Sequence, residues 1–258
     1  MAKMKLIKPK KIVTGHYSCK TDVGKVRMTN EDQVAATVNA KGDVFLIVCD
    51  GMGGQNKGEL ASSMAVSHLI DDFNSSRFLS AMHVQIWLNR KIRAVNKEIN
   101  TEARRNPLYR GMGTTLTAVV IYHDVMVIAQ IGDSRLYQLN GTTLEQVSVD
   151  QTYVGYLYRT GQIKKEDMET HPRRHMLMNA LGTYPSIEID LKVKPYNNQT
   201  LLLCSDGLYN NVSETTIASV LKGADSPEEK VNELISIANT NGGSDNIGIV
   251  IWEATYAG

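Results

Sequence analysis

Acidic residues stand at the ends of several short apolar runs in this chain. These acids are Glu31, Asp32, Asp50, Asp133, Asp206 and Asp245. A carboxylate at the end of a buried strand loses hydration, which is costly unless something compensates its charge. No cationic side chain recurs beside these acids, so a shared divalent cation is the compensator that fits them all. Oxygen ligands without a His/Cys cluster favour Mg²⁺ or Mn²⁺ over zinc.

Two of the acids are followed by glycine, as Asp50-Gly51 and Asp206-Gly207. Each pair taken alone indicates a turn, and only the acids taken together predict a metal centre. Around Gly51 the backbone can approach a ligand closely and offer a carbonyl oxygen, or it can simply form a flexible connection into the next helix. A phosphate-binding P-loop is excluded because no Gly-Lys-Ser/Thr follows, and the dinucleotide fingerprint fails at Asn56.

Arg27 is the one cationic residue whose position near the acids invites a role. It stands three residues before Asn30, which precedes Glu31 and Asp32. Arg27 can be an ion-pair partner of this acidic cluster. Beside a dinuclear cation site, its planar guanidinium can instead bind two oxygens of a phosphoryl group.

The elements that position these residues are short, apolar, β-branched runs and amphipathic helices. Strands are predicted at Val44–Cys49, Leu116–Tyr122, Val125–Ile131, Thr200–Cys204 and Ile247–Trp252, with a hairpin at His123-Asp124. Helices are predicted at Gly58–Phe73, Phe78–Arg104 and Ser226–Asn239; the second has an apolar face of Met82, Ile86, Ile92, Val95 and Ile99, and the third is capped by Ser226. Strands and helices do not alternate regularly, so an α+β architecture of packed sheets flanked by helices is favoured over a doubly wound sheet.

Length and composition predict one globular domain. The chain has 258 residues, 42% of them hydrophobic, and a formal net charge of +1, which gives no field that favours nucleic acid or acidic lipid. Residues 1–11 hold five lysines and form a basic arm, leaving residues 12–256 as the domain. Apolar runs fall far short of the ~20 residues that span a membrane. No secretory signal is expected, and three unpaired cysteines (Cys19, Cys49 and Cys204) favour a cytoplasmic protein.

Six segments, in order along the chain, carry a resemblance to a known family. They are Thr21–Asp32, Val48–Gly54, Gly111–Leu116, Ile131–Leu136, Leu203–Leu208 and Gly243–Ile249. Together they resemble the metal-dependent serine/threonine phosphatases of the protein phosphatase 2C family, in its compact bacterial form. The resemblance implies a β-sandwich of two antiparallel sheets flanked by pairs of helices, with a dinuclear Mn²⁺ or Mg²⁺ centre at one edge.

The resemblance also implies roles for single residues. Asp50 would bridge two cations, with Glu31 and the Gly51 carbonyl on one side and Asp206 and Asp245 on the other. Asp32 would lie in or behind this shell, and Asp133 matches the position of a third, weaker metal. Arg27 matches the arginine that holds the substrate phosphate, while a metal-activated water attacks phosphorus. Thr114 and Thr115 are expected to support the site structurally.

The chain departs from the family pattern at several positions. Met52 stands where many eukaryotic members have a histidine that is considered the general acid. In the segment that resembles the mobile flap, about residues 150–182, Gln151-Thr152 replaces the common His-Ser and Asn179 replaces a common Arg. His171 and His175 in this segment are expected to be flap surface or helix caps, with contact to the phosphoprotein as the alternative. These departures leave the flap contacts open but not the metal site.

The function that the resemblance implies is hydrolysis of phosphoserine and phosphothreonine in proteins, opposing a bacterial-type Ser/Thr kinase. A phosphoprotein-binding pseudophosphatase without turnover and a structural cation-binding domain are the alternatives. Degenerate relatives commonly lose acids, whereas all six acids are present here. The expected partners are phosphorylated proteins, with no nucleic acid and no stable membrane insertion, and the expected state is a monomer.

Overall fold

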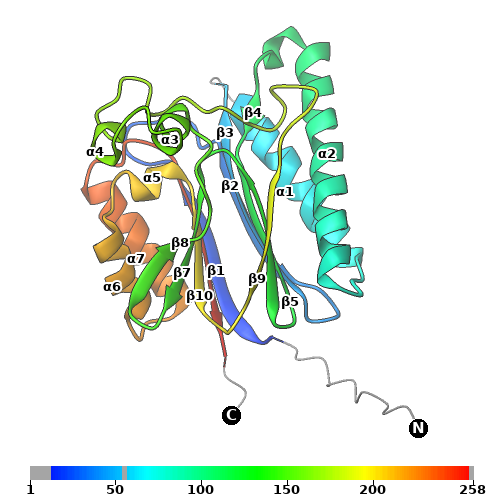
Figure 1. The fold of residues 1–258 in the computed structure, drawn as a ribbon, viewed down its shortest axis with the longest axis vertical. Helices are drawn as coiled ribbons and strands as arrows, with labels where there is room; N and C mark the ends of the chain where they lie inside the picture. Colours follow the sequence, from blue (N-terminus) through cyan, green and yellow to red (C-terminus); the bar gives the residue numbers. More distant parts are fainter. Residues whose placement is uncertain (1–12, 54–56, 256–258) are drawn as a thin grey trace.

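Two antiparallel sheets pack face to face in the computed structural model, which describes residues 13–53 and 57–255 (Figure 1). The first sheet has the order β1-β11-β10-β7-β8, and the second has the order β2-β3-β5-β6-β9 with the short β4 paired to β3. The strands are β1 (Gly15–Asp22), β2 (Asp32–Val38), β3 (Val44–Met52), β4 (Gly113–Thr114), β5 (Leu116–Tyr122), β6 (Val125–Ile131), β7 (Arg135–Asn140), β8 (Thr143–Gln146), β9 (Asp190–Pro195), β10 (Thr200–Cys204) and β11 (Ile247–Ala254). The α+β sandwich expected from the sequence is confirmed.

Helices cover the outer faces of both sheets. They are α1 (Lys57–Ser75) and α2 (Ala81–Arg105) on the second sheet, followed by a 3-10 turn η1 (Pro107–Tyr109); α5 (Asp206–Tyr209), α6 (Glu214–Lys222) and α7 (Pro227–Thr240) on the first; and α3 (Tyr153–Arg159) and α4 (Lys165–Met168) in the flap segment. Within the described part of the chain, none of these helices combines the length and apolar character needed to cross a membrane. The basic arm expected at residues 1–11 lies outside the described residues.

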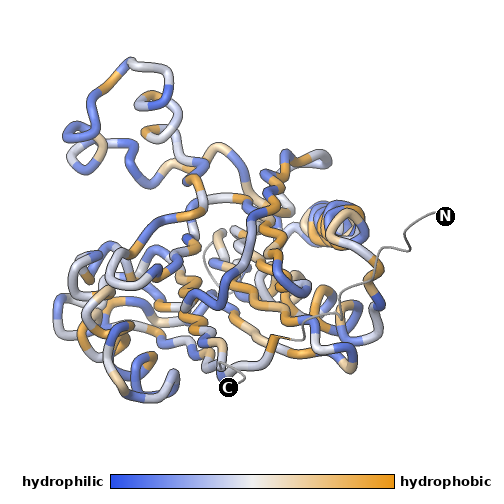
Figure 2. Tube along the Cα trace, turned by 60° about the horizontal axis from the view of Figure 1, so that its bottom comes forward, coloured by the Kyte–Doolittle hydropathy of each residue, from blue (hydrophilic) through white to orange (hydrophobic). Residues whose placement is uncertain are grey.

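The central strands are apolar on both faces because each face is covered. In β3, Val44, Leu46 and Val48 point into the space between the sheets, while the alternate residues Phe45 and Ile47 pack under α1 and α2. This alternation with period two follows from the pleat of a strand. The sequence of β3 is therefore continuously hydrophobic from Val44 to Cys49. Figure 2 shows hydrophobic residues gathered along the strands in the middle of the molecule.

The apolar face expected on the second long helix is partly wrong. The helix begins at Ala81 rather than Phe78, because the Ser80 side chain caps it by accepting from His83 N at 3.2 Å. Its buried residues include Val84, Leu88, Ile92, Val95 and Ile99, whereas Met82 is 62% exposed and Ile86 is 55% exposed. Met82 and Ile86 each precede a buried residue by two positions, which is about 200° around a helix. They therefore lie on the opposite, solvated face.

Two local expectations are confirmed. β5 and β6 form the expected hairpin, in which Tyr122 pairs with Val125 and His123 takes a positive φ of 56°. Ser226 caps α7 through a capping box with Glu229, and Pro227 is the first helical residue. Such caps satisfy backbone N–H groups that have no partner inside the helix.

The flap segment contains two short helices, α3 and α4. Thr152 caps α3 by accepting from Gly155 N at 3.1 Å, and its backbone forms an isolated bridge with Leu177. A second bridge joins Leu181 to Thr114. Figure 1 shows α3 and α4 at the top of the sandwich, at the end where β3 ends and α5 begins.

Candidate active site

The acids singled out from the sequence come from strand ends in both sheets. Asp32 begins β2 and lies directly opposite Asp50 in the antiparallel β2–β3 pair. Asp206 follows β10 and opens α5, and Asp245 precedes the neighbouring strand β11. Asp133 lies in the turn between β6 and β7. The fold thus brings together acids that are far apart in the sequence.

The backbone of Asp50 is fixed by Thr114, the last residue of β4, and by Thr115, which separates β4 from β5. Its N–H donates to Thr115 Oγ1 at 2.9 Å, and its carbonyl accepts from Thr115 N and from Thr114 Oγ1, both at 2.9 Å. Thr115 Oγ1 also lies 2.7 Å from Ser134 Oγ. The supporting role expected for both threonines is confirmed, because both hold the Asp50 backbone.

A buried serine holds Asp32. Ser205 Oγ donates to Asp32 Oδ2 at 2.5 Å and accepts from Gly248 N at 2.7 Å, and Asp32 is only 1% exposed. The contact joins the two sheets at the site, because Asp32 belongs to β2 and Gly248 belongs to β11. Sequence reasoning missed Ser205; its place between an apolar strand and Asp206 was the available signal.

Glu31 contacts the first turn of α1. Its Oε1 accepts from Gly58 N at 3.2 Å, and its carbonyl accepts from Gly51 N at 3.1 Å and from Ser62 Oγ at 2.6 Å. A carboxylate is favourable at this position because the N-terminus of a helix carries partial positive charge. A Cβ on Gly51 would lie 2.3 Å from Gly58 O, so close packing of β3 against α1 requires a glycine there.

Arg27 reaches the site from the loop between β1 and β2. Its Nη2 donates to Asp245 Oδ2 at 2.7 Å. This contact joins the β1–β2 loop to the segment between α7 and β11. The neighbouring Asn246 fixes that loop, because its Nδ2 donates to Val23 O and to Thr29 O, both at 2.9 Å. Asn246 Oδ1 also accepts from Glu31 N at 2.9 Å. Sequence reasoning assigned no role to Asn246, although it lies inside one of the six matching segments.

Asp133 borders a cavity of about 620 Å³ between the strand ends and the flap. Arg135 lines the same cavity and donates to both carboxylate oxygens of Asp150 at 2.8–3.3 Å. Its guanidinium carbon lies 3.6 Å from the ring centre of Tyr209, whose hydroxyl donates to Asp133 O at 3.1 Å. This network connects the Asp133 turn to α5 and to the base of the flap.

The acids of the site raise one another's pKa. Burial, followed by the charges of Asp32, Asp206, Asp133 and Asp245, raises the pKa of Asp50 well above its ordinary value. Burial likewise raises the pKa of Asp32, although the hydrogen bond from Ser205 opposes the shift. Burial and neighbouring carboxylates raise the pKa of Asp133 to about 7 and that of Asp206 to about 6, against the opposing charges of Arg135 and Arg27.

This crowding fits a divalent cation, since the nearby guanidinium groups are already shared with Asp245 and Asp150. In residues 13–53 and 57–255, however, no three His, Cys, Asp or Glu side chains are arranged together as ligands of one ion. Asp32 is turned toward Ser205, and Asp245 is turned toward Arg27. Binding an ion therefore requires some carboxylates to rotate, or backbone carbonyls and waters to complete the shell.

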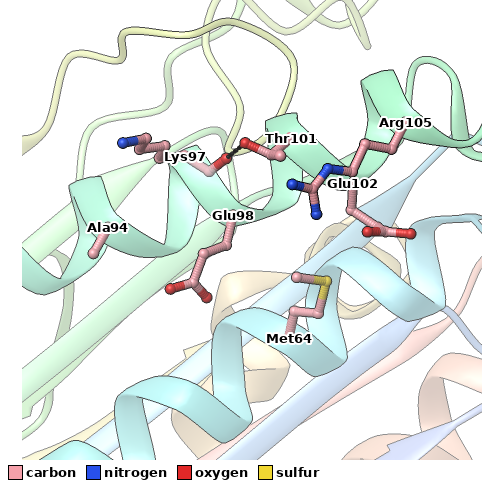
Figure 3. A pocket seen from close by; sticks show the side chains of 7 residues that line it. All are labelled: Met64, Ala94, Lys97, Glu98, Thr101, Glu102 and Arg105. Carbon is pink, nitrogen blue, oxygen red and sulfur yellow. Dashed lines mark hydrogen bonds between the residues drawn. The ribbon is translucent and has the colours of Figure 1, made fainter.

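A second hollow, of about 480 Å³, lies between α1 and α2 and has a different character (Figure 3). Lys97, Glu98, Glu102 and Arg105 line it from the outer surface of α2, and Met64 lines it from α1. Charges of both signs lie together along this helix surface, as they do on a solvated helix face. The hollow contains none of the acids described above, so the strand-end cluster remains the candidate site.

Comparisons with known proteins identify the family of this chain. The family model described as protein phosphatase 2C matches residues 25–243. The chain is 42% identical over 240 residues to the serine/threonine phosphatase stp of Listeria welshimeri, covering 92% of this chain and 95% of that protein. It superposes with a TM-score of 0.90 on the crystal structure of the serine/threonine phosphatase Stp1 from Staphylococcus aureus, at 31% identity over 99% of this chain and 100% of that one.

A further solved structure contains metal. The catalytic domain of the serine threonine protein phosphatase PstP, in complex with two manganese ions, aligns with a TM-score of 0.83 at 32% identity, covering 95% of this chain and 100% of that one. The family model spans most of the chain, and the relatives cover nearly all of it. This chain belongs to the protein phosphatase 2C family.

Proposed function

We propose that this protein is a metal-dependent serine/threonine phosphatase that removes phosphate from phosphoserine and phosphothreonine in proteins. The observation that carries the proposal is the cluster of buried and half-buried carboxylates, contributed by both sheets, whose charges raise one another's pKa. Such a cluster is costly in a protein without a cation and well suited to bind one. Members of this family hydrolyse phosphoproteins with a divalent metal, and the chain retains all six acids.

Manganese is the ion that the comparison with PstP favours, and two ions are proposed here. Asp50 would bridge them, with Glu31 and the Gly51 carbonyl on one side and Asp206 and Asp245 on the other. Asp32 would lie just behind the ions, and Asp133 would border a third, weaker position. When bound, the cations lower the pKa of a coordinated water and withdraw charge from the phosphoryl group.

The side chains of this protein then orient and neutralise the substrate. Arg27 uses one amino group to donate to Asp245 at 2.7 Å, and the guanidinium has five N–H donors in total. The remaining donors can bind two phosphate oxygens while Asp245 keeps the group in place. Met52, at the end of β3, carries no titratable proton, so no side chain beside Asp50 is proposed as the general acid.

Several further proposals concern the cell. We propose a cytoplasmic monomer that acts on phosphorylated proteins, among them a Ser/Thr kinase. The buried, free thiols of Cys49 and Cys204 support a reducing compartment. Size-exclusion chromatography with light scattering tests the monomer, and dephosphorylation of an autophosphorylated kinase tests the substrate.

Hydrolysis of a phosphothreonine peptide during a manganese titration tests the function. The wild-type protein should release phosphate only with metal, and Asp206→Asn should lower kcat/KM by at least about a hundredfold. Asp225→Asn, which makes the same charge change at an exposed position, is the matched control. Metal-independent release, or full activity in Asp206→Asn, would contradict the proposal. Tight peptide binding by the wild-type protein without release at any metal concentration would instead identify a pseudophosphatase.

A further inference from the structure

Two apolar side chains project into solvent beside the site, on the loop between β1 and β2. Met28 is 96% exposed and Val26 is 65% exposed, and Met28 is the most exposed large hydrophobic residue in the described part of the chain. The two residues flank Arg27, which contacts Asp245. Single exposed apolar residues need no explanation. Two exposed apolar residues on either side of Arg27 in the sequence, at the edge of the carboxylate cluster, do call for an explanation.

The loop that carries these residues is held firmly. Besides the two hydrogen bonds from Asn246, Lys25 N donates to Gly243 O at 2.8 Å and Gly24 N donates to Asp22 Oδ1 at 2.9 Å. Gly24 has a φ of +76°, and a Cβ there would lie 2.3 Å from Asp245 O, so the loop packs tightly on the segment before β11. The exposed side chains are therefore presented by an ordered backbone, and a ligand meets little ordering cost there.

The proposed reaction indicates which ligand would contact Met28 and Val26. A phosphorylated side chain must bring its phosphate to the end of the sandwich where Arg27, Asp206 and Asp245 interact. Consecutive Cα atoms are ~3.8 Å apart and an extended chain advances ~3.3 Å per residue. The side chains that a substrate carries one to three residues from its phosphorylated residue therefore lie within reach of Met28 and Val26. The flexible, polarisable methionine can adapt to several apolar partners.

We propose that Met28, with Val26, forms an apolar contact for the substrate segment next to the phosphorylated residue, and so favours phosphoproteins with hydrophobic residues there. The contact rests on the proposed function, because it needs the phosphate bound near Arg27. Burial of the Met28 side chain against an apolar substrate residue removes both from water. A charged residue at the same substrate position gains nothing from this contact and loses hydration.

The test compares two phosphothreonine peptides and a small aryl phosphate, all with manganese. The peptides are identical except for leucine or serine at the positions within three residues of the phosphothreonine, and the aryl phosphate has no flanking residues. The wild-type protein should prefer the leucine peptide, and Met28→Ala should reduce that preference about fivefold while leaving aryl phosphate hydrolysis unchanged. Met82→Ala, an equal change at an exposed site on α2, should leave both unchanged. Arg27→Ala should weaken the binding of all three substrates.

The possible outcomes distinguish a failure of the Met28 contact from a failure of the proposed function. An unchanged leucine preference in Met28→Ala, or an equal loss on the aryl phosphate, overturns the contact. A wild-type protein that hydrolyses all three substrates without any leucine preference also overturns it while leaving the proposed function intact. A wild-type protein that releases no phosphate from any substrate contradicts the proposed function itself.

Discussion

The carboxylate cluster and the flap border the same cavity but are built differently. In the cluster, strand pairing places the acids, and backbone contacts fix them, as for Asp50 on Thr114 and Thr115. The flap leaves the sandwich near Gln151 and returns near Asn179, and side-chain amides secure its base. The cluster therefore stores repulsion in a rigid frame, whereas the base of the flap is held by side-chain amide hydrogen bonds and by the Arg135–Asp150 ion pair. The first region fixes the positions of the acids, and the second lines the cavity that Asp133 borders.

The two flap residues that depart from the family pattern contact each other. Asn179 Nδ2 donates to Gln151 Oε1 at 2.8 Å and to Glu188 O at 2.6 Å. Gln151 Oε1 also accepts from Gly132 N at 3.1 Å, next to Asp133. The replacements for the common His and Arg are thus two parts of one contact. They leave the base of the flap without a titratable or charged pair at this point.

The largest effect should come from removing the central charge of the cluster. With saturating manganese, Asp50→Asn should lower kcat/KM by about a thousandfold or more, because the residue proposed to bridge both ions is lost. In chelator, the same variant should be more stable than the wild-type protein, since repulsion with Asp32 and Asp206 disappears. Phosphate release and urea denaturation measure the two effects. A less stable metal-free variant would contradict the account of stored repulsion.

The pH dependence of the stability of the metal-free protein also tests the repulsion within the carboxylate cluster. The folded-state pKa values of Asp133, about 7, and Asp206, about 6, lie above the unfolded value of about 3.9. The folded state then binds more protons, so their stabilising contribution is complete below pH ~4 and is lost as pH rises through about 6 and 7. Urea midpoints in chelator should fall across this range.

Added manganese should reverse that trend, because ions bind the deprotonated carboxylates. Asp133→Asn should flatten the upper part of the metal-free profile. A metal-free midpoint that rises from pH 5 to pH 8 would show that the acids are already compensated within the fold.

The smallest effect should come from the flap. Asn179→Ala removes the hydrogen bonds to Gln151 and Glu188, so hydrogen exchange should accelerate in residues 151–178. KM for a phosphothreonine peptide should rise about threefold, because the loss of these two neutral hydrogen bonds loosens the flap, with aryl phosphate hydrolysis unchanged. Asn89→Ala on α2 is the matched control. Equal losses on both substrates would place Asn179 in the cluster rather than in the flap.

Sequence reasoning located the parts of the fold that bury continuous apolar runs. The strands of the sandwich interior, the capped helix at Ser226 and the acids at strand ends were all found, because their patterns are local. Two of the missed strands depend on partners far away in the sequence. β1 (GHYSCKTD) is a largely exposed edge strand whose pairing with β11 spans more than two hundred residues, and β9 (DLKVKP) is a similarly polar edge.

The supporting residues of the site were missed for a related reason. Ser205 and Asn246 are ordinary residues in local sequence, and only tertiary contacts give them their role at Asp32 and in the Arg27 loop. The side of α2 was also misread, because Met82 and Ile86 fit an apolar spacing that the helix does not bury. The spacing of apolar residues predicts that the helix has a buried face, whereas packing against β3 and β5 determines which face is buried.

The placement of β11 between β1 and β10 has a consequence for synthesis. Of these three neighbours, β11 leaves the ribosome last, so the other two remain unpaired along one edge until residues 247–254 emerge. Asp245 and Asn246 arrive with the same segment, and they anchor the loop that bears Arg27. A nascent chain thus exposes strand edges and lacks a formed site until this late segment inserts. Completion of the first sheet and assembly of the site therefore depend on the same segment.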